Sequence, residues 1–244
     1  MGTSYGGEVS GLLAIGEQLY VADGPMARDF GIPWDTRMIV AVLGDGSVWV
    51  ESPVLAAHET LAEIAALGPV RYALASTPRH VWRLGPWHTL FPEAELWACR
   101  RTVATLKPDA LLPLRTLTGE AEPSWAADFD QVAVKGSFAI EEICYLHKPS
   151  GTLIVGDLIE VLSPRPGKRL HNVLLRFGGQ AAPDGGTARD IRASFLNRAA
   201  LRASLERVLD WDFDQVVVGH GPIITTDARG FVARAFAWAF RRSA

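Results

Sequence analysis

The sequence predicts an α/β fold in which short strands alternate with amphipathic helices. The chain of 244 residues is 48% hydrophobic and 21% charged, which is typical of a globular protein able to bury a large core. Short β-branched and apolar runs recur along it, bounded by Gly and Pro. Between several of these runs, apolar residues follow the three- and four-residue spacing of a helix.

The first half is expected to open with a β-meander and to continue as alternating strands and helices. Gly44-Asp45-Gly46 is a tight-turn signal between two strands, and Gly68-Pro69 ends the first helix. The predicted strands are Leu19–Ala22, Met38–Leu43, Ser47–Glu51, Val70–Ala75 and Ala94–Ala98. The predicted helical segments are Glu59–Leu67 and Trp87–Phe91.

The second half repeats this pattern, and we expect one domain over residues 1–244. Asp227 is placed to cap the last helix, and Pro164–Gly186, which opens with Gly, Pro and basic residues, is interpreted as an excursion or lid. The predicted strands are Gln131–Lys135, Glu142–Leu146, Thr152–Val155 and Gln215–Val218. The predicted helices are a long one, Ala188–Leu209, and a closing one, Asp227–Arg241.

A short internal sequence repeat marks two candidate site loops. Asp128–Val132 recurs as Asp212–Val216, and each copy enters a strand that ends in a loop containing Gly. The two loops could then face the same side, and because ligands of α/β proteins usually bind at strand ends, Gly136-Ser137 and Gly219-His220-Gly221 are candidate site loops. The alternative is that two similar acidic turns precede buried strands by chance.

Composition excludes several classes of partner. Twenty-four Lys and Arg against 27 Asp and Glu give a net charge of -3, which does not favour nucleic acid. No apolar run approaches the ~20 residues of a membrane-spanning helix, and the start lacks the pattern of a secretory signal. We therefore expect a cytoplasmic protein without a membrane partner, with Cys99 and Cys144 as buried free thiols.

Several stretches resemble the metallo-β-lactamase fold superfamily and, within it, the DUF4336 family. Gly136 to Asp157 parallels the superfamily's Gly-His-Thr-Pro-Gly turn, two strands joined by a hairpin, and a Gly-Asp after the second strand. Val217–Pro222 matches the final Gly-His-Gly loop, while Thr36–Met38 and Trp49–Val54 resemble the start of the DUF4336 pattern. The resemblance spans nearly the whole chain and implies an αββα sandwich of metallo-β-lactamase type.

The same resemblance implies a depleted metal site. Active members of the superfamily carry a His-x-His-x-Asp-His cluster that binds zinc or iron, because such a site needs several converging ligands. The corresponding loop here retains only His80, and Ser137 stands where the third His would be. The surviving ligand positions are Asp157 and His220, with His80 as a third candidate. The site would hold one zinc, iron or manganese ion, or no metal at all.

Other residues are candidates for binding a substrate. Arg37 and Arg79 could pair with Asp157 or hold an anionic group, since guanidinium suits carboxylates, although exposed arginines are common. Ser137, and His171 in the predicted lid, could also reach a ligand. Two functions follow: a hydrolase that cleaves an ester, lactone, amide or phosphoester with metal-activated water, or a metal-free protein that binds a small molecule or a protein.

Overall fold

The computed structural model describes residues 11–29, 32–105 and 112–241. The described chain forms two compact units. The N-terminal unit comprises Met1–Leu117 and Glu122–Asp128, and the C-terminal unit comprises Thr118–Ala121 and Phe129–Ala244. The expectation of one domain stays a prediction, and residues 1–10, where no secretory signal is expected, lie outside the described residues. No helix among the described residues is long and apolar enough to cross a membrane.

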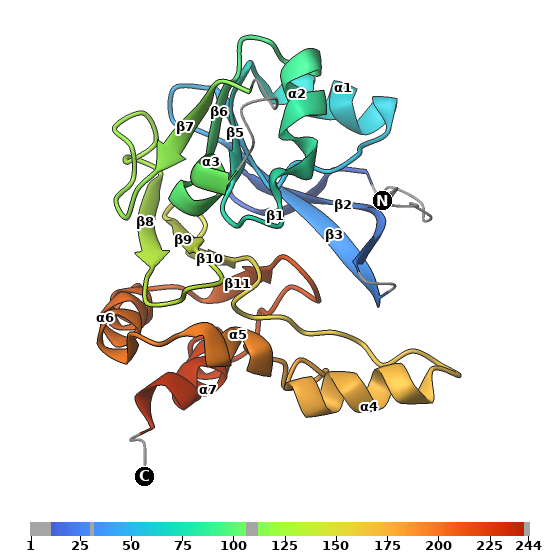
Figure 1. The fold of residues 1–244 in the computed structure, drawn as a ribbon. Coiled ribbons are helices and arrows are strands. Elements are labelled where there is room, and N and C mark those ends of the chain that lie inside the picture. Colours follow the sequence, from blue (N-terminus) through green and yellow to red (C-terminus); the bar gives the residue numbers. More distant parts are fainter. Residues whose placement is uncertain (1–10, 30–31, 106–111, 242–244) are drawn as a thin grey trace. The chain divides into compact units, whose positions relative to one another are not determined.

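The N-terminal unit contains a seven-stranded sheet of order β1-β2-β3-β4-β5-β6-β7 (Figure 1). The first four strands form the predicted antiparallel meander, and β4 to β7 are parallel to one another. The strands are β1 (Leu13–Gly16), β2 (Leu19–Asp29), β3 (Ile32–Val42), β4 (Val48–Glu51), β5 (Val70–Ala75), β6 (Glu95–Cys99) and β7 (Leu114–Leu117). The predicted β5 is confirmed to the residue, whereas β1 and β7 were not predicted.

Helices connect the parallel strands of this sheet and pack on it through buried apolar side chains. Ile64 of α1 and Trp87 of α2 pack with β2, β3 and β4 residues, while Leu84 packs with those of β5 and β6. The indole N–H of Trp87 donates to the Val54 carbonyl at 2.9 Å, so its buried polar atom is satisfied. The helices are α1 (His58–Leu67), η1 (Val81–Arg83, a 3₁₀ turn), α2 (Leu84–Leu90) and α3 (Arg100–Thr105).

The C-terminal unit contains a four-stranded sheet of order β11-β10-β9-β8. Strand β10 is parallel to β11, and β9 is antiparallel to both β10 and β8. Therefore β8, β10 and β11 run in one direction, and their carboxyl ends lie at one edge of the sheet. The two candidate site loops, Gly136-Ser137 and Gly219-His220-Gly221, follow β8 and β11. The expectation that they face the same side is therefore confirmed. The strands are β8 (Phe129–Val134), β9 (Glu142–His147), β10 (Thr152–Val155) and β11 (Gln215–Val218).

Three helices of the C-terminal unit, α5, α6 and α7, cover one face of this sheet (Figure 1). Their shared core includes Leu201, Leu205 and Phe236 from the helices and Val216 and Leu153 from the strands. Helix α4 lies within the segment that was predicted to be an excursion or lid. The helices are α4 (Arg169–Gly178), α5 (Arg189–Ser194), α6 (Arg198–Leu209) and α7 (Ala228–Phe240).

The expectation of one continuous helix over Ala188–Leu209 is wrong. The chain leaves the helix at Phe195 and starts again after Asn197, whose side chain accepts a hydrogen bond from the Ala200 N–H at 3.0 Å. The Asn197 N–H in turn donates to the Gly136 carbonyl at 3.1 Å. The apolar spacing continues across the break, so the period alone did not reveal it, whereas Asn is a strong N-cap residue.

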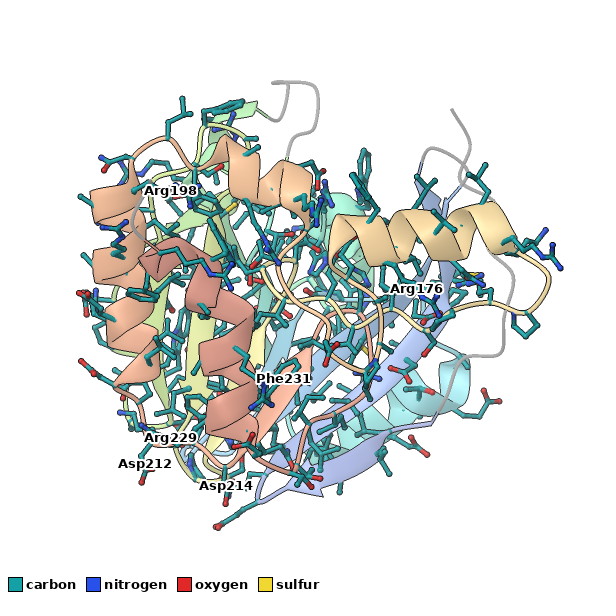
Figure 2. The ribbon with its side chains drawn as sticks, turned by 90° about the horizontal axis from the view of Figure 1, so that it is seen from below. Arg176, Arg198, Asp212, Asp214, Arg229 and Phe231 are labelled. Atoms are coloured by element: carbon teal, nitrogen blue, oxygen red, sulfur yellow. The ribbon has the colours of Figure 1, made fainter. Side chains whose placement is uncertain are left out.

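Helix α7 begins where expected, but Asp227 does not cap it. Asp227 has a φ of 49° and makes no side-chain cap hydrogen bond. Its carboxylate accepts from Arg234 Nη1 at 2.7 Å instead. The first turn of α7 is held by Arg229, which donates to the Trp211 carbonyl at 2.7 Å and lies 3.3 Å from Asp212 (Figure 2). These contacts tie α7 to the loop that leads into β11.

Candidate functional site

Asp157 and His220 occupy equivalent places after two neighbouring parallel strands. Val155 of β10 pairs with Val218 of β11, and the Gly219 N–H extends the ladder to the Val155 carbonyl at 3.0 Å. Each of the two residues comes second after its strand, so their side chains meet at the sheet edge. His220 Nε2 lies 3.3 Å from Asp157 Oδ1, and the side chains are 11% and 0% exposed. The two surviving ligand positions, Asp157 and His220, therefore lie side by side in the C-terminal unit.

The turn that carries Asp157 is held by Glu142, which was not singled out from the sequence. Glu142 Oε1 accepts the Gly156 N–H at 2.7 Å, and Oε2 accepts the Leu158 N–H at 2.8 Å. Glu142 is buried, and such charge-assisted bonds are stronger than neutral ones. The carboxylate thus fixes the backbone on both sides of Asp157. A charged residue at the start of an otherwise apolar strand was the available signal.

The loop of His220 is fixed by Val161. The Val161 N–H donates to the His220 carbonyl at 2.9 Å. Gly221 has a φ of 137°, and a Cβ there would lie 2.6 Å from the Val161 oxygen. The glycine after His220 is therefore required both by its backbone conformation and by this close approach. Both members of the pair are consequently held on a fixed backbone, as a binding site needs.

The geometry of the pair fits a metal ion. Two ligands of a tetrahedral ion with bonds of ~2.0 to 2.2 Å stand about 3.4 Å apart. The observed separation between Asp157 Oδ1 and His220 Nε2 is 3.3 Å. Imidazole and carboxylate also suit zinc, iron and manganese. The same separation equally suits a direct ion pair, since Asp157 is buried and a buried carboxylate needs a partner.

Cys144, on the same strand as Glu142, is not a competing ligand or nucleophile. Burial, and then the negative charge of Glu142, raise the pKa of the Cys144 thiol well above its usual range. A thiol with a raised pKa stays protonated and unreactive. The prediction that Cys144 and Cys99 are buried free cysteines is confirmed.

Ser137 lies at the same sheet edge, but its hydroxyl supports a turn. Its Oγ accepts the N–H groups of Ala139 at 3.0 Å and Ile140 at 2.9 Å. It also lies 2.6 Å from the Oγ of Ser194, which donates to the Ile191 carbonyl. Ser137 therefore fixes the loop after β8 and joins it to α5. A role in substrate binding stays a prediction.

His80 lies in the N-terminal unit at the start of η1. Its Nδ1 is hydrogen-bonded to the Ser52 Oγ, and Ser52 donates to the buried carboxylate of Glu51, which also accepts from Ser76. A metal-binding histidine commonly donates its other ring N–H to such a chain, which fixes the tautomer. Any bond from His80 to a metal would therefore use Nε2.

The remaining predicted site residues have separate surroundings. Arg37 forms a two-point ion pair with Asp23 across β2 and β3, at 2.7 Å and 3.2 Å. Arg79 is exposed, and its backbone N–H donates to Thr77 Oγ1 at 3.2 Å. His171 is half-buried on α4. The substrate-binding roles of these three residues stay predictions.

Residues 30–177 match a family model described as a domain of unknown function, DUF4336. The chain belongs to the DUF4336 family. The matched range contains the loop of Asp157 and ends at α4. Among curated protein sequences, none gives a significant match.

Solved structures show the fold of this DUF4336 protein. A fragment of diflavin flavoprotein A 5 from Nostoc sp. PCC 7120 has a TM-score of 0.64 at 13% identity, covering 96% of both chains. The metallo-β-lactamase DIM-1 exposed to ceftazidime has a TM-score of 0.63 at 14% identity, covering 96% of this chain and 100% of its own. FIM-1 from Pseudomonas aeruginosa, in a mono-zinc form, has a TM-score of 0.61 at 13% identity, covering 95% of each. The predicted αββα sandwich of metallo-β-lactamase type is confirmed at the level of fold.

Proposed function

We propose that this DUF4336 protein is a hydrolase with a depleted metal site formed by Asp157 and His220. The observation that carries the proposal is the 3.3 Å contact between these side chains at the ends of β10 and β11. Asp157 is fully buried. Glu142 fixes the turn of Asp157 by hydrogen bonds to its backbone, and Val161 fixes the loop of His220 in the same way. A single-metal centre requires preorganised ligands of this kind, and the pair supplies an imidazole and a carboxylate.

In this proposal Asp157 Oδ1 and His220 Nε2 would hold one zinc, iron or manganese ion. A metal bound there would supply Lewis-acid polarisation of a carbonyl or phosphoryl oxygen. Asp157 contributes the negative charge that offsets the cation. Glu142 holds the backbone on both sides of Asp157, so that the Asp157 carboxylate stays directed at His220. The similar fold of FIM-1, described in a mono-zinc form, supports a site with one ion.

The substrate side of the proposal rests on the sequence. We propose a small ester, lactone or related substrate and a cytoplasmic location. His80 is the proposed third ligand or catalytic residue, through Nε2, because its Nδ1 is bound to Ser52. The proposed substrate-binding residues are Arg37, Arg79, Ser137 and His171.

One observation favours a second function, a metal-free protein that binds a small molecule or a protein partner. His220 and Asp157 already form a direct contact at 3.3 Å, so the buried carboxylate has a partner without a metal. Two ligands in the C-terminal unit are also fewer than the three or four protein groups of most zinc sites.

Elemental analysis separates the two functions. The wild-type protein, purified without a histidine tag, is compared with Asp157→Ala, His220→Ala and His80→Ala, with His58→Ala as the control because His58 is an exposed histidine on α1. The hydrolase proposal expects about one ion per chain in the wild type and the control, lost in Asp157→Ala and His220→Ala. Loss in His80→Ala as well would establish the third ligand. A metal-free wild type, or metal retained in Asp157→Ala and His220→Ala, would contradict the proposed site.

A further inference from the structure

Helix α4 turns an apolar face toward solvent. Leu170 is 74% exposed, Val173 61%, Leu174 55% and Phe177 69%. These residues follow the spacing i, i+3, i+4 and i+7, so they share one side of the helix. Leu175, which is 5% exposed, lies on the inner side. A surface helix of a globular protein normally presents its polar side to water, so α4 is inverted in this respect.

Positive charge flanks this apolar face. The stretch from Leu162 to Pro183 contains no Asp or Glu, although the whole chain has a net charge of -3. Arg169 and Arg176 are seven residues apart and therefore lie on one side of the helix, next to the apolar face; Figure 2 labels Arg176 on α4. The guanidinium of Arg189, from α5, lies 4.6 Å from the Phe177 ring centroid. The basic residues of the stretch itself are Arg165, Lys168, Arg169 and Arg176.

Specific contacts hold the helix in this orientation. The Asn172 side chain accepts the Arg165 N–H at 2.7 Å and donates to the Arg165 carbonyl at 2.8 Å. At the other end, the left-handed Gly179 donates its N–H to the Leu175 and Arg176 carbonyls. Asn172 and Leu175 thus fix the inner side of α4. The outward apolar face is a built feature of the fold and not a loosely packed segment.

We propose that α4 is an interfacial helix that binds the surface of a membrane containing anionic lipids. Its apolar side chains would enter the boundary between headgroups and acyl chains, while its arginines and lysine contact lipid phosphates. The expectation of no membrane partner rested on the absence of a spanning segment and of a secretory signal, and an interfacial helix depends on neither. Two copies of α4 packed face to face would bring like charges together, which disfavours self-association through this face.

Vesicle co-sedimentation of the full chain tests the proposal. The probes are phosphatidylcholine vesicles with and without phosphatidylserine. We expect binding at least ~10-fold tighter to the anionic vesicles, and weaker at high salt. Val173→Glu combined with Phe177→Glu, and separately Arg169→Glu combined with Arg176→Glu, should each weaken binding about 10-fold or more. Leu196→Glu is the matched control, since Leu196 is 75% exposed but lies outside α4.

Several results would overturn the proposal. A folded wild-type chain that does not bind anionic vesicles has no such surface. Binding that survives both pairs of substitutions would arise elsewhere on the protein. Light scattering that shows a dimer, abolished by Val173→Glu with Phe177→Glu while vesicles remain unbound, would assign the face to a second copy of the chain. Binding of an acidic protein without binding of vesicles would show that the partner of this face is a protein and not a membrane. Circular dichroism of each variant confirms that the fold is retained.

Discussion

Glu142 accepts a 2.8 Å hydrogen bond from the backbone N–H of Leu158, and its other carboxylate oxygen accepts the Gly156 N–H at 2.7 Å. The residue between these two donors is Asp157. A side chain from the neighbouring strand β9 therefore fixes the backbone that carries the Asp157 carboxylate. Glu142 is a positioning residue, and its contribution can be measured separately from that of Asp157.

Glu142→Gln should destabilise the protein. The amide keeps one acceptor but places its N–H₂ group against one of the two buried backbone donors. An unsatisfied buried donor costs about 1 to 3 kcal/mol, and charged hydrogen bonds are at the upper end. Chemical denaturation measures the loss, with Glu141→Gln as the neighbouring control because Glu141 is half-buried and precedes the strand. Equal effects of the two substitutions would contradict the role of Glu142.

The stability of the folded protein should fall as the pH is lowered, over a range set by the pKa of His147. Burial lowers the pKa of His147 from 6.5 to about 4. Above pH 6.5 the ring is neutral in both states; between pH 6.5 and about 4 only the unfolded chain binds the proton, so folding loses stability as the pH falls. The full shift corresponds to about 3 kcal/mol. Below about pH 4 the folded ring titrates too, and this contribution stops growing.

His147→Phe removes this titration and tests its assignment. The ring already lies 4.8 Å from the Phe129 ring, and its Nε2 has no hydrogen-bond partner among the described residues. Urea denaturation at several pH values should show a weaker pH dependence than in the wild type. The exposed His58 is the control, since His58→Phe should leave the dependence unchanged. A wild-type pH dependence retained in His147→Phe would show that another group is responsible.

Gly221→Ala should disturb the His220 loop. The new Cβ would lie 2.6 Å from the Val161 oxygen, at a φ of 137° that side chains rarely adopt. We expect a loss of about 2 kcal/mol or more, from strain and overlap together. Gly167→Ala is the comparison, because Gly167 also has a positive φ, 73°, but no atom lies within 4 Å of its Cβ position. Thermal unfolding of both variants separates the overlap from the cost of the left-handed backbone, ~1 kcal/mol.

Asn197→Ala should weaken the start of α6. The side chain accepts the Ala200 N–H at 3.0 Å, and loss of such a cap costs about 1 kcal/mol. Asn197→Asp keeps the acceptor and should retain most of the stability. Thermal denaturation distinguishes the two substitutions. Equal melting temperatures of Asn197→Ala and the wild type would mean that the cap contributes nothing measurable to stability.

Local patterns predicted much of the fold. Strands β5, β10 and β11 were placed to the residue, because Gly, Pro or polar turns bound short apolar runs. The break before α6 was missed, since Phe195 and Leu196 continue the helical spacing while long-range contacts such as the Asn197 N–H to Gly136 decide the backbone. The edge strands β1 and β7 also escaped prediction, because pairing with a neighbouring strand, more than their own sequence, defines them.

The candidate site was predictable where a motif marked it. The loops of Asp157 and His220 carried a recognisable order, and strand direction then explains why the two meet. Glu142 carried no motif, because its partners are backbone groups that any sequence would provide. The face of α4 was hidden for another reason. The segment was interpreted as an excursion or lid and no helix was predicted in it, and the sequence does not reveal which side of a helix faces water.

The parallel pairing of β10 with β11 also governs when the site can exist. Asp157 precedes α4, α5 and α6, whereas His220 follows all three, so the two side chains meet only after a long stretch of chain has closed into a loop. Closing such a loop has an entropic cost and delays folding. During synthesis, a chain whose β11 is still inside the ribosome contains Asp157 but cannot yet present His220, which follows β11. Assembly of the pair therefore requires that β11 has already paired with β10.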